Sequence, residues 1–255
     1  MLGASLAAVV VERNVMTYRR QWVAFVTGFF EPIFYLFSLG IGLGALVETV
    51  SVEGRTVSYA QFVAPALLAS SAMNGAIFDS TYGMFFKLRY MHTYDAMLAT
   101  PVGPRDIAVG EVLWSLVRSG AYVVGFLVIA TGMGLVTSWW ALLAVPAATL
   151  IGFTFSAVGM AATTWVRGFV DFDYIQLALV PLFLLSATFF PVSTYPASVR
   201  WLVQLSPLYH GVALERGLML GDVGWSLLLH AAVLVAMGAV GLLVLRRRLD
   251  VLLLR

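Results

Sequence analysis

Residues 223–248 read VGWSLLLHAAVLVAMGAVGLLVLRRR, an apolar run followed by a short basic run. From Val223 to Leu245 there is no Asp, Glu, Lys or Arg, and three consecutive arginines follow directly, Arg246 to Arg248. A helix that crosses a membrane needs about 20 mostly apolar residues. Arginines directly after such a helix anchor it near anionic headgroups on the cytoplasmic face. This stretch therefore predicts a transmembrane helix whose C-terminal end lies in the cytoplasm.

The composition of the whole chain agrees with a membrane location. Hydrophobic residues make up 61% of the chain, charged residues 11%, and the mean hydropathy is +0.92. A soluble domain carries roughly 25% charged residues, so lipid must be the solvent for most of this chain. The absence of cysteine excludes disulfides and thiolate metal sites. The net charge of +2 is too small to indicate a nucleic-acid partner.

Five further apolar stretches are long enough, or nearly so, to cross a membrane. The shortest contains Pro181, which neighbouring helices can accommodate by satisfying the freed carbonyl. Residues 1–21 lack the cleavage site of a signal peptide and predict a helix on the membrane surface. We therefore expect one all-α membrane domain over residues 1–255, with six transmembrane helices at 22–46, 61–86, 112–131, 140–164, 174–190 and 223–245.

Basic residues in the connections predict the orientation of these helices. With the N-terminus in the cytoplasm, the inner segments hold eleven Lys and Arg residues and the outer segments hold three. Cytoplasmic loops carry the excess of Lys and Arg. We therefore expect a multi-pass membrane protein with both termini in the cytoplasm.

Two connections are longer than simple loops. The inner one, 87–110, predicts a short helix near Met91–Ala99. The outer one, 191–222, holds two apolar segments too short to span, which predict re-entrant helices in the outer leaflet. In the second of these, Ser206 can cap the helix, Pro207 suits its first position, and Gly221 can end it.

Several motifs, in the same order along nearly the whole chain, carry a family resemblance. They are ERNVMTYRR, FFEPIFYLFSLGIGLG, YAQFVAPALLASSAM, TYDAMLATPVGPRDIAVGEVLW and FFPVSTYPASVRWLVQLSPLYHGVALERGL. The chain resembles the permease subunits of type-2 ABC exporters, most closely the branch with nodulation lipo-oligosaccharide exporters and daunorubicin-type drug exporters.

This resemblance implies a set of partners and a mechanism. Two permeases pair in the membrane, and we prefer a homodimer to a heterodimer. A separate dimer of cytoplasmic ABC ATPase subunits holds ATP and Mg, and it docks on the coupling helix, the segment that matches Met91–Ala99. The outer re-entrant helices line the exit. By alternating access, the pair would export an amphiphile such as a lipid-linked saccharide, a lipid or a drug.

The residues themselves are compatible with this assignment. The chain has no G-x-x-x-x-G-K-[ST] motif, so it has no P-loop for ATP, and we expect it to bind no cofactor. An intramembrane enzyme, such as a lipid-modifying enzyme, is the first alternative. It would need converging catalytic groups, of which the sequence shows none, and no G-x-S-x-G is present. A passive channel is the second alternative, but it leaves the long inner connection without a purpose.

Residues of the inner connection are candidates for ATPase coupling. Apolar and aromatic side chains alternate there with charged ones, a pattern that suits anchors of a helix in a partner's groove. An ordinary solvated loop would explain the charges alone. The candidates are Met91, His92, Tyr94, Asp95, Met97 and Leu98.

Ionisable residues near the spans are candidates for the translocation pathway. An ionised group at the bilayer centre costs about 2.5–3.5 kcal/mol on insertion scales, so it should face protein or water. Most of these residues also have a structural explanation. Glu31 can lie at the inner interface, and Asp79 can be satisfied within the bundle. His210, Glu215 and Arg216 can lock the outer helices by hydrogen bonds. Arg118 has two candidate partners, Glu31 and Glu111. We expect no metal site. The candidates are Glu31, Asp79, Arg118, His210, Glu215 and Arg216.

Overall fold

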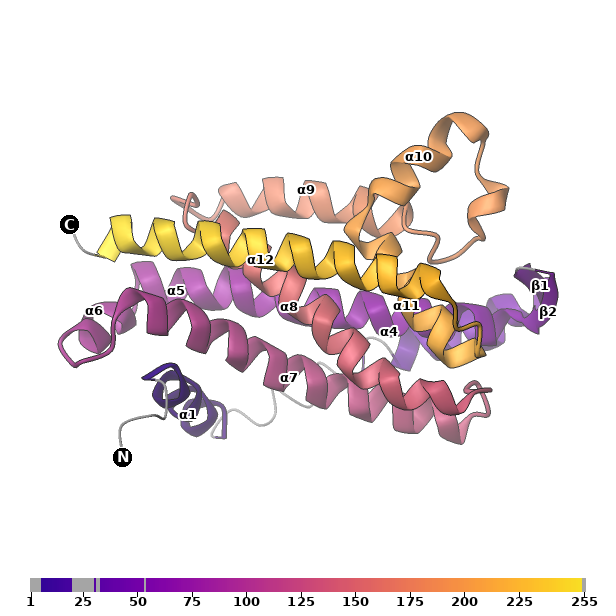
Figure 1. Cartoon of the computed structure of the whole chain (residues 1–255), viewed down its shortest axis with the longest axis horizontal. Coiled ribbons are helices and arrows are strands. Elements are labelled where there is room, and N and C mark those ends of the chain that lie inside the picture. Colours follow the sequence, from indigo (N-terminus) through magenta and orange to yellow (C-terminus); the bar gives the residue numbers. More distant parts are fainter. Residues whose placement is uncertain (1–5, 20–29, 31–32, 53, 254–255) are drawn as a thin grey trace.

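The structure, a computed structural model, describes residues 6–19, 30, 33–52 and 54–253 as an elongated helical bundle. Most of the long helices run along the long axis of the molecule (Figure 1). Helix α6 (Thr93–Leu98) and the last turns of α12 (Trp225–Leu253) lie at one end, which we call the α6 end. Strands β1 (Thr49–Val52) and β2 (Arg55–Ser58) lie at the other, which we call the hairpin end.

Four helical stretches within the described residues are long and apolar enough to cross a membrane. The first, Tyr59–Arg89, consists of α4 (Tyr59–Phe78), the π-helical turn η2 (Asp79–Gly83) and α5 (Met84–Arg89). The others are α7 (Pro104–Gly132), the 3-10 turn η3 (Trp139–Leu143) with α8 (Ala144–Thr163), and α12. They overlap the stretches 61–86, 112–131, 140–164 and 223–245.

Two of these helices are longer than their apolar runs. Helix α7 starts at Pro104, since a proline needs no hydrogen bond for its nitrogen at the first turn. The Asp106 carboxylate also accepts a hydrogen bond from the Gly103 amide. Helix α12 continues through the three arginines to Leu253, because Arg is a good helix former.

The remaining two predicted spans have shorter described counterparts. The stretch 22–46 starts outside the described residues. Its later part belongs to an apolar helix at Ile33–Val47, which includes the π-turn η1 (Ser38–Leu43) and α3 (Gly44–Val47). For 174–190 the predicted limits are wrong, because α9 runs from Asp171 to Leu184. Three residues beyond its end, Ala187 has a left-handed backbone with a φ of 54°.

Helix α8 packs against α4, α7, α11 and α12 at the centre of the bundle. Glycines bring the helices close to one another: a Cβ at Gly241 of α12 would lie 2.8 Å from the Val158 nitrogen. A Cβ at Gly211 would lie 2.9 Å from Ile151 Cδ1. Small residues at helix contacts are typical of bundles in lipid, where the gain comes from close packing.

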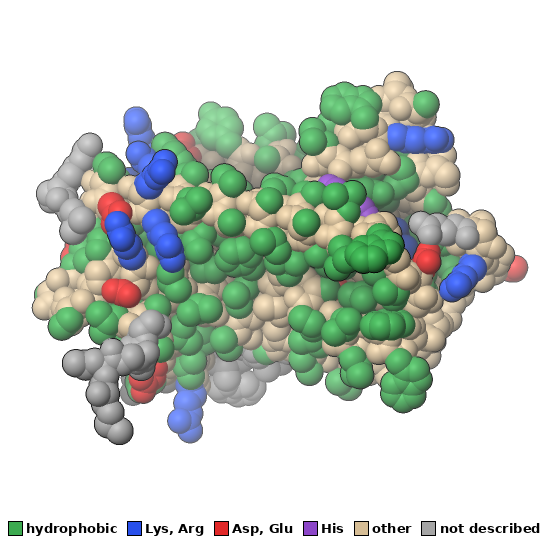
Figure 2. Space-filling model, viewed as in Figure 1, with side chains coloured by type: hydrophobic (Ala, Val, Ile, Leu, Met, Phe, Trp, Pro, Cys, Tyr) green, Lys and Arg blue, Asp and Glu red, His purple; other side chains and the backbone are tan. Residues whose placement is uncertain are grey.

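The outside of the bundle has an apolar middle. Figure 2 shows hydrophobic side chains over the central part of the visible face and charged side chains gathered toward its ends. Large apolar residues of α12 are exposed, among them Leu229, Val235, Val240 and Leu243. A bundle of this kind is a multi-pass membrane protein.

The connections at the hairpin end contain ordered elements. Strands β1 and β2 pair antiparallel, and Ser58 then caps α4 in a capping box with Gln61. After η4 (Val192–Thr194) come two short helices, α10 (Ala197–Leu205) and α11 (Pro207–Leu220). Helix α11 ends at Gly221, which has a φ of 81°. Ser206 does not cap α11 with its side chain, since its hydroxyl lies 2.6 Å from that of Ser186.

Candidate functional site: a buried charged seam below the α6 end

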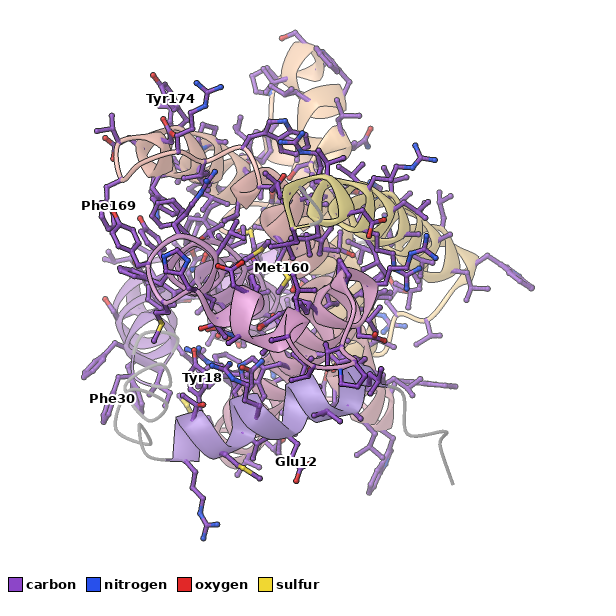
Figure 3. All side chains as sticks on the ribbon, turned by 90° about the vertical axis from the view of Figure 1, so that its left-hand side faces the viewer. Glu12, Tyr18, Phe30, Met160, Phe169 and Tyr174 are labelled. Atoms are coloured by element: carbon purple, nitrogen blue, oxygen red, sulfur yellow. The ribbon has the colours of Figure 1, made fainter. Side chains whose placement is uncertain are left out.

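Helix α1 (Leu6–Arg19) lies against α7 near the α6 end. The contact is close because α7 has Gly110 there; a Cβ at this position would lie 2.8 Å from the Ala7 carbonyl oxygen. Ala7, Val10 and Asn14 are buried, and their spacing puts them on one face of the helix. In Figure 3, Tyr18 lies on the side of α1 that faces the bundle, whereas Glu12 points away from it.

An ion pair joins α5 to α7 beside this helix. Lys87 Nζ lies 2.6 Å from Glu111 Oε2, and the two side chains are only 15% and 5% exposed. Asn14 of α1 bridges the pair, because its amide donates to Glu111 Oε2 at 3.2 Å and its oxygen accepts from Lys87 Nζ at 3.2 Å. Three helices therefore meet at one carboxylate.

A second ion pair lies deeper in the bundle. Asp79 Oδ1, in the π-turn η2, accepts a hydrogen bond from Arg118 Nη1 of α7. Tyr18 of α1 donates to the same oxygen at 3.1 Å and accepts from Arg118 Nη1 at 3.3 Å. Arg118 Nε also donates to the Tyr122 hydroxyl at 3.2 Å. Each charge of these two pairs thus has a partner of opposite sign, as charges at membrane depth require.

The π-turn η2 sets the direction of Asp79. The turn is buried, and the carbonyl of Ser80 accepts a hydrogen bond from Thr163 of α8 at 3.1 Å. A hydroxyl from a neighbouring helix satisfies this carbonyl where the regular helical ladder is interrupted. Such single π-turns within α-helices occur frequently at functional sites.

We call the two ion pairs with Asn14 and Tyr18 the charged seam. The small gap within it is lined by Tyr18, Asp79, Gly83, Lys87, Glu111, Trp114 and Met160, and it has no room for a water molecule. In this arrangement the gap has no room for a substrate either. The seam can hold α1, span Tyr59–Arg89 and α7 in one arrangement, and it can transmit a movement among them.

Helix α6 lies next to the seam, at the α6 end of the bundle. The side chains of Met91, His92 and Asp95 are exposed, and His92 Nδ1 lies 2.9 Å from Asp95 Oδ2. Tyr94 and Met97 are only 1% and 8% exposed, so they anchor α6 inward on the bundle. The expectation that these two side chains reach a partner's groove is wrong in this respect, because a six-residue helix this close to the bundle buries one face against it.

The candidates in α11 lie far from the seam, at the hairpin end. His210 Nδ1 lies 2.7 Å from His230 Nδ1 of α12. Arg216 donates to the Ala187 carbonyl at 2.9 Å, and its guanidinium carbon lies 3.9 Å from the centre of the Phe62 ring. Glu215 is 0% exposed, and neither carboxylate oxygen has a hydrogen-bond partner among the described residues.

Only some of the charged residues singled out from the sequence come together in the structure. Asp79 and Arg118 meet, Glu111 pairs with Lys87 rather than with Arg118, and Glu31 lies outside the described residues. Sequence reasoning missed Asn14 and Tyr18, although their spacing of four continues the face that begins at Ala7. In the part of the chain that the structure describes, no group of three or more His, Asp or Glu side chains could hold a metal ion.

Comparison with known proteins gives a consistent result. Residues 6–220 match the family described as ABC-2 type transporter. Nodulation protein J of Rhizobium leguminosarum bv. viciae is 35% identical over 244 residues, which cover 93% of this chain and 92% of that protein. Nodulation protein J of Rhizobium leguminosarum bv. trifolii is 34% identical over 223 residues, 86% of this chain and 83% of that protein. The protein of the same name in Rhizobium meliloti is 33% identical over 213 residues, 82% of this chain and 79% of that protein.

Proposed function

The chain belongs to the ABC-2 type transporter family and is the membrane permease of an ABC exporter, and from this premise we propose how it is driven and what it carries. A separate cytoplasmic ATPase docks on the exposed edge of α6. Its movement passes through the charged seam to the spans, which open alternately to the two sides of the membrane. The cargo is a lipo-oligosaccharide.

The placement of α6 is the observation that carries this proposal. The helix lies between span Tyr59–Arg89 and α7, with only short links on either side. Its buried face, with Tyr94 and Met97, packs into the core that also contains Ile107 of α7. A push on the exposed edge at His92 and Asp95 would therefore reach both spans without slack.

Two properties support an amphiphilic cargo. The relatives are named for nodulation, and the motifs of this chain resemble the branch that exports nodulation lipo-oligosaccharides. One side of the bundle also exposes aromatic rings, since Phe30, Phe169 and Tyr174 lie on the same side in Figure 3 and are 52%, 51% and 70% exposed. Apolar rings beside a pathway suit a molecule with an acyl chain.

The same side of the bundle offers a contact surface for a second permease subunit. Helix α9 buries only Phe172 among its residues, and Leu177, Val180 and Leu184 are exposed. A second copy of the chain would cover this face in a homodimer. With six crossings, counting Ile33–Val47 and α9 as the first and fifth, both termini would lie on the cytoplasmic side of the inner membrane, and α10 and α11 would dip into the outer leaflet.

Docking is tested by replacing the exposed edge of α6. The chain is co-expressed with the ATPase subunit encoded beside it, and complex formation is measured in lipid nanodiscs. For His92→Ala/Asp95→Ala we expect affinity to fall by about tenfold, the effect of 1.4 kcal/mol. Arg55→Ala, exposed at the hairpin end, is the control and should bind normally. Equal binding by all three chains would refute docking at α6.

Cargo is tested separately in inside-out vesicles that contain the complex. ATP-dependent uptake of a fluorescent lipo-oligosaccharide is compared with uptake of an apolar drug. We expect uptake of the lipo-oligosaccharide only. Uptake of the drug alone would replace the proposed cargo with a drug and leave the driving mechanism as proposed.

A further inference from the structure

Helix α12 carries three arginines beyond its apolar run. Arg246 to Arg248 belong to the packed part of the helix, because Leu245 and Leu249 on either side are 0% and 1% exposed and lie in the core that also contains Tyr94. Figure 2 shows basic side chains gathered at this α6 end. In the described part of the chain, no Asp or Glu forms an ion pair with any of the three arginines. Three positive charges are therefore held on a rigid helix with no acidic partner among these residues.

The end of α8 orients one of these arginines, Arg248. Its guanidinium carbon lies 4.6 Å from the centre of the Trp165 ring, and its Nε donates to the Thr164 hydroxyl at 3.4 Å. That hydroxyl can accept, because its own proton is donated to the Ala161 carbonyl at 2.7 Å. The guanidinium is thus held on one face and at one nitrogen. Its two Nη groups have no acceptor among the described residues.

A guanidinium held in this way is suited to bind a phosphate. The planar fork of donors matches two phosphate oxygens, and bonds of this charge-assisted kind are stronger than those between neutral groups. Stacking on an aromatic ring fixes the plane of the fork before the ligand arrives, so less conformational freedom is lost on binding. Arg248 is only partly exposed, so its position is set by α8 rather than by bulk water.

The depth of this arrangement in the membrane points to a lipid as the source of the phosphate. Trp165 lies two residues beyond the end of α8 and is 53% exposed, and Trp side chains are enriched at the level of the headgroups. Arg248 lies three residues beyond Leu245, a rise of about 4.5 Å along the helix. The neighbouring arginines favour an anionic headgroup, because the cation of a zwitterionic one would meet further positive charge.

We propose that Arg248, held by Trp165 and Thr164, binds the phosphate of an anionic phospholipid between the ends of α8 and α12. This site goes beyond the proposed function and requires neither the ATPase nor the cargo. In the orientation proposed above, the lipid belongs to the inner leaflet, and its headgroup holds the two helix ends together. General attraction to anionic headgroups would act on Arg247 as it does on Arg248, whereas a built site depends on Arg248.

Arg248→Gln and Arg247→Gln are a matched pair that tests this difference. Each removes one positive charge from the same turn of α12, but Arg247 is exposed and has no hydrogen bond to a described residue. The purified permease in an uncharged maltoside detergent is titrated with phosphatidylglycerol, and bound lipid is measured by native mass spectrometry. We expect the affinity to fall about tenfold for Arg248→Gln, which loses charge-assisted hydrogen bonds, and about twofold for Arg247→Gln.

Trp165→Leu is a second variant that leaves every charge in place. It should weaken lipid binding about threefold, because the guanidinium loses the ring that fixes its plane. This variant decides the question if Arg248→Gln does not fold. Equal losses for the two arginine variants, or unchanged binding by Trp165→Leu, would reduce the site to diffuse surface charge and overturn the inference.

Two further titrations identify the ligand. Phosphatidylcholine carries the same phosphate with a compensating cation, and we expect it to bind more weakly than phosphatidylglycerol. Equal binding of the two lipids would overturn the assignment to an anionic headgroup. Inorganic phosphate should not displace the bound lipid; displacement at millimolar concentration would assign the site to free phosphate and overturn the assignment to a lipid.

Discussion

Breaking the deeper ion pair of the charged seam should destabilise the bundle far more than removing the pair altogether. Arg118→Met takes away the hydrogen bonds of the guanidinium to Asp79, Tyr18 and Tyr122. Asp79 Oδ1 then keeps only the Tyr18 hydroxyl, and Oδ2 has no partner among the described residues even before the change. Leaving a buried charge uncompensated typically costs about 3–5 kcal/mol.

Replacing both partners should recover most of this loss. In Asp79→Leu/Arg118→Met no charge is left buried, and apolar replacements of buried ion pairs are often neutral or stabilising by about 1–4 kcal/mol. The double replacement should therefore be at least about 2–3 kcal/mol more stable than Arg118→Met alone, and the effects of the two single replacements should not add. Unfolding of the purified permease in mixed detergent micelles, followed by circular dichroism, measures each free energy.

An exposed pair in the same chain provides the matched control. Arg105 Nε lies 4.0 Å from Asp250 Oδ2, and the two side chains are 78% and 33% exposed. Arg105→Met should cost less than about 1 kcal/mol, as exposed pairs do. If Arg118→Met were as mild as Arg105→Met, or if the effects at Asp79 and Arg118 simply added, the account of the seam as a buried, mutually dependent pair would be wrong.

Four further predictions concern other parts of the fold. Gly110→Val should push α1 off α7 and lower stability by about 1–3 kcal/mol; faster proteolysis within α1 would show it, and unchanged proteolysis would count against the contact. Gly221→Ala should cost about 1–2 kcal/mol in the same unfolding assay, because its φ of 81° strains any residue with a Cβ. Glu215→Leu should raise stability by about 1–3 kcal/mol, since it removes a buried carboxylate without partners among the described residues; a loss would reveal a partner. Burial lowers the pKa of His210, so the unfolded chain takes up a proton more readily than the folded one; stability should be constant above pH about 6.5 and fall below it, and His210→Phe should flatten that profile.

The long apolar stretches could be located from the sequence because length and composition decide them. The ends of α11 could also be predicted from the sequence, because Pro207 and Gly221 act on the local backbone. The ion-pair partners in the seam could not be predicted, since charges separated by 24 and 39 residues along the chain can pair in several ways until the helices are placed. The inward direction of Tyr94 was missed for the same reason: alternation of apolar and charged residues shows that α6 has two faces, but it does not show which one the bundle covers.

The π-turn at Asp79–Gly83 makes span Tyr59–Arg89 sensitive to its exact length. In a regular α-helix each residue advances the rotation by about 100°. Deleting one residue from the turn would restore a regular helix, and the Asp79 carboxylate would lose the backbone turn that aims it at Arg118. A chain shortened by one amino acid there could still insert into the membrane with every apolar stretch intact. It would then be a permease in which movement of the docked ATPase no longer reaches the spans.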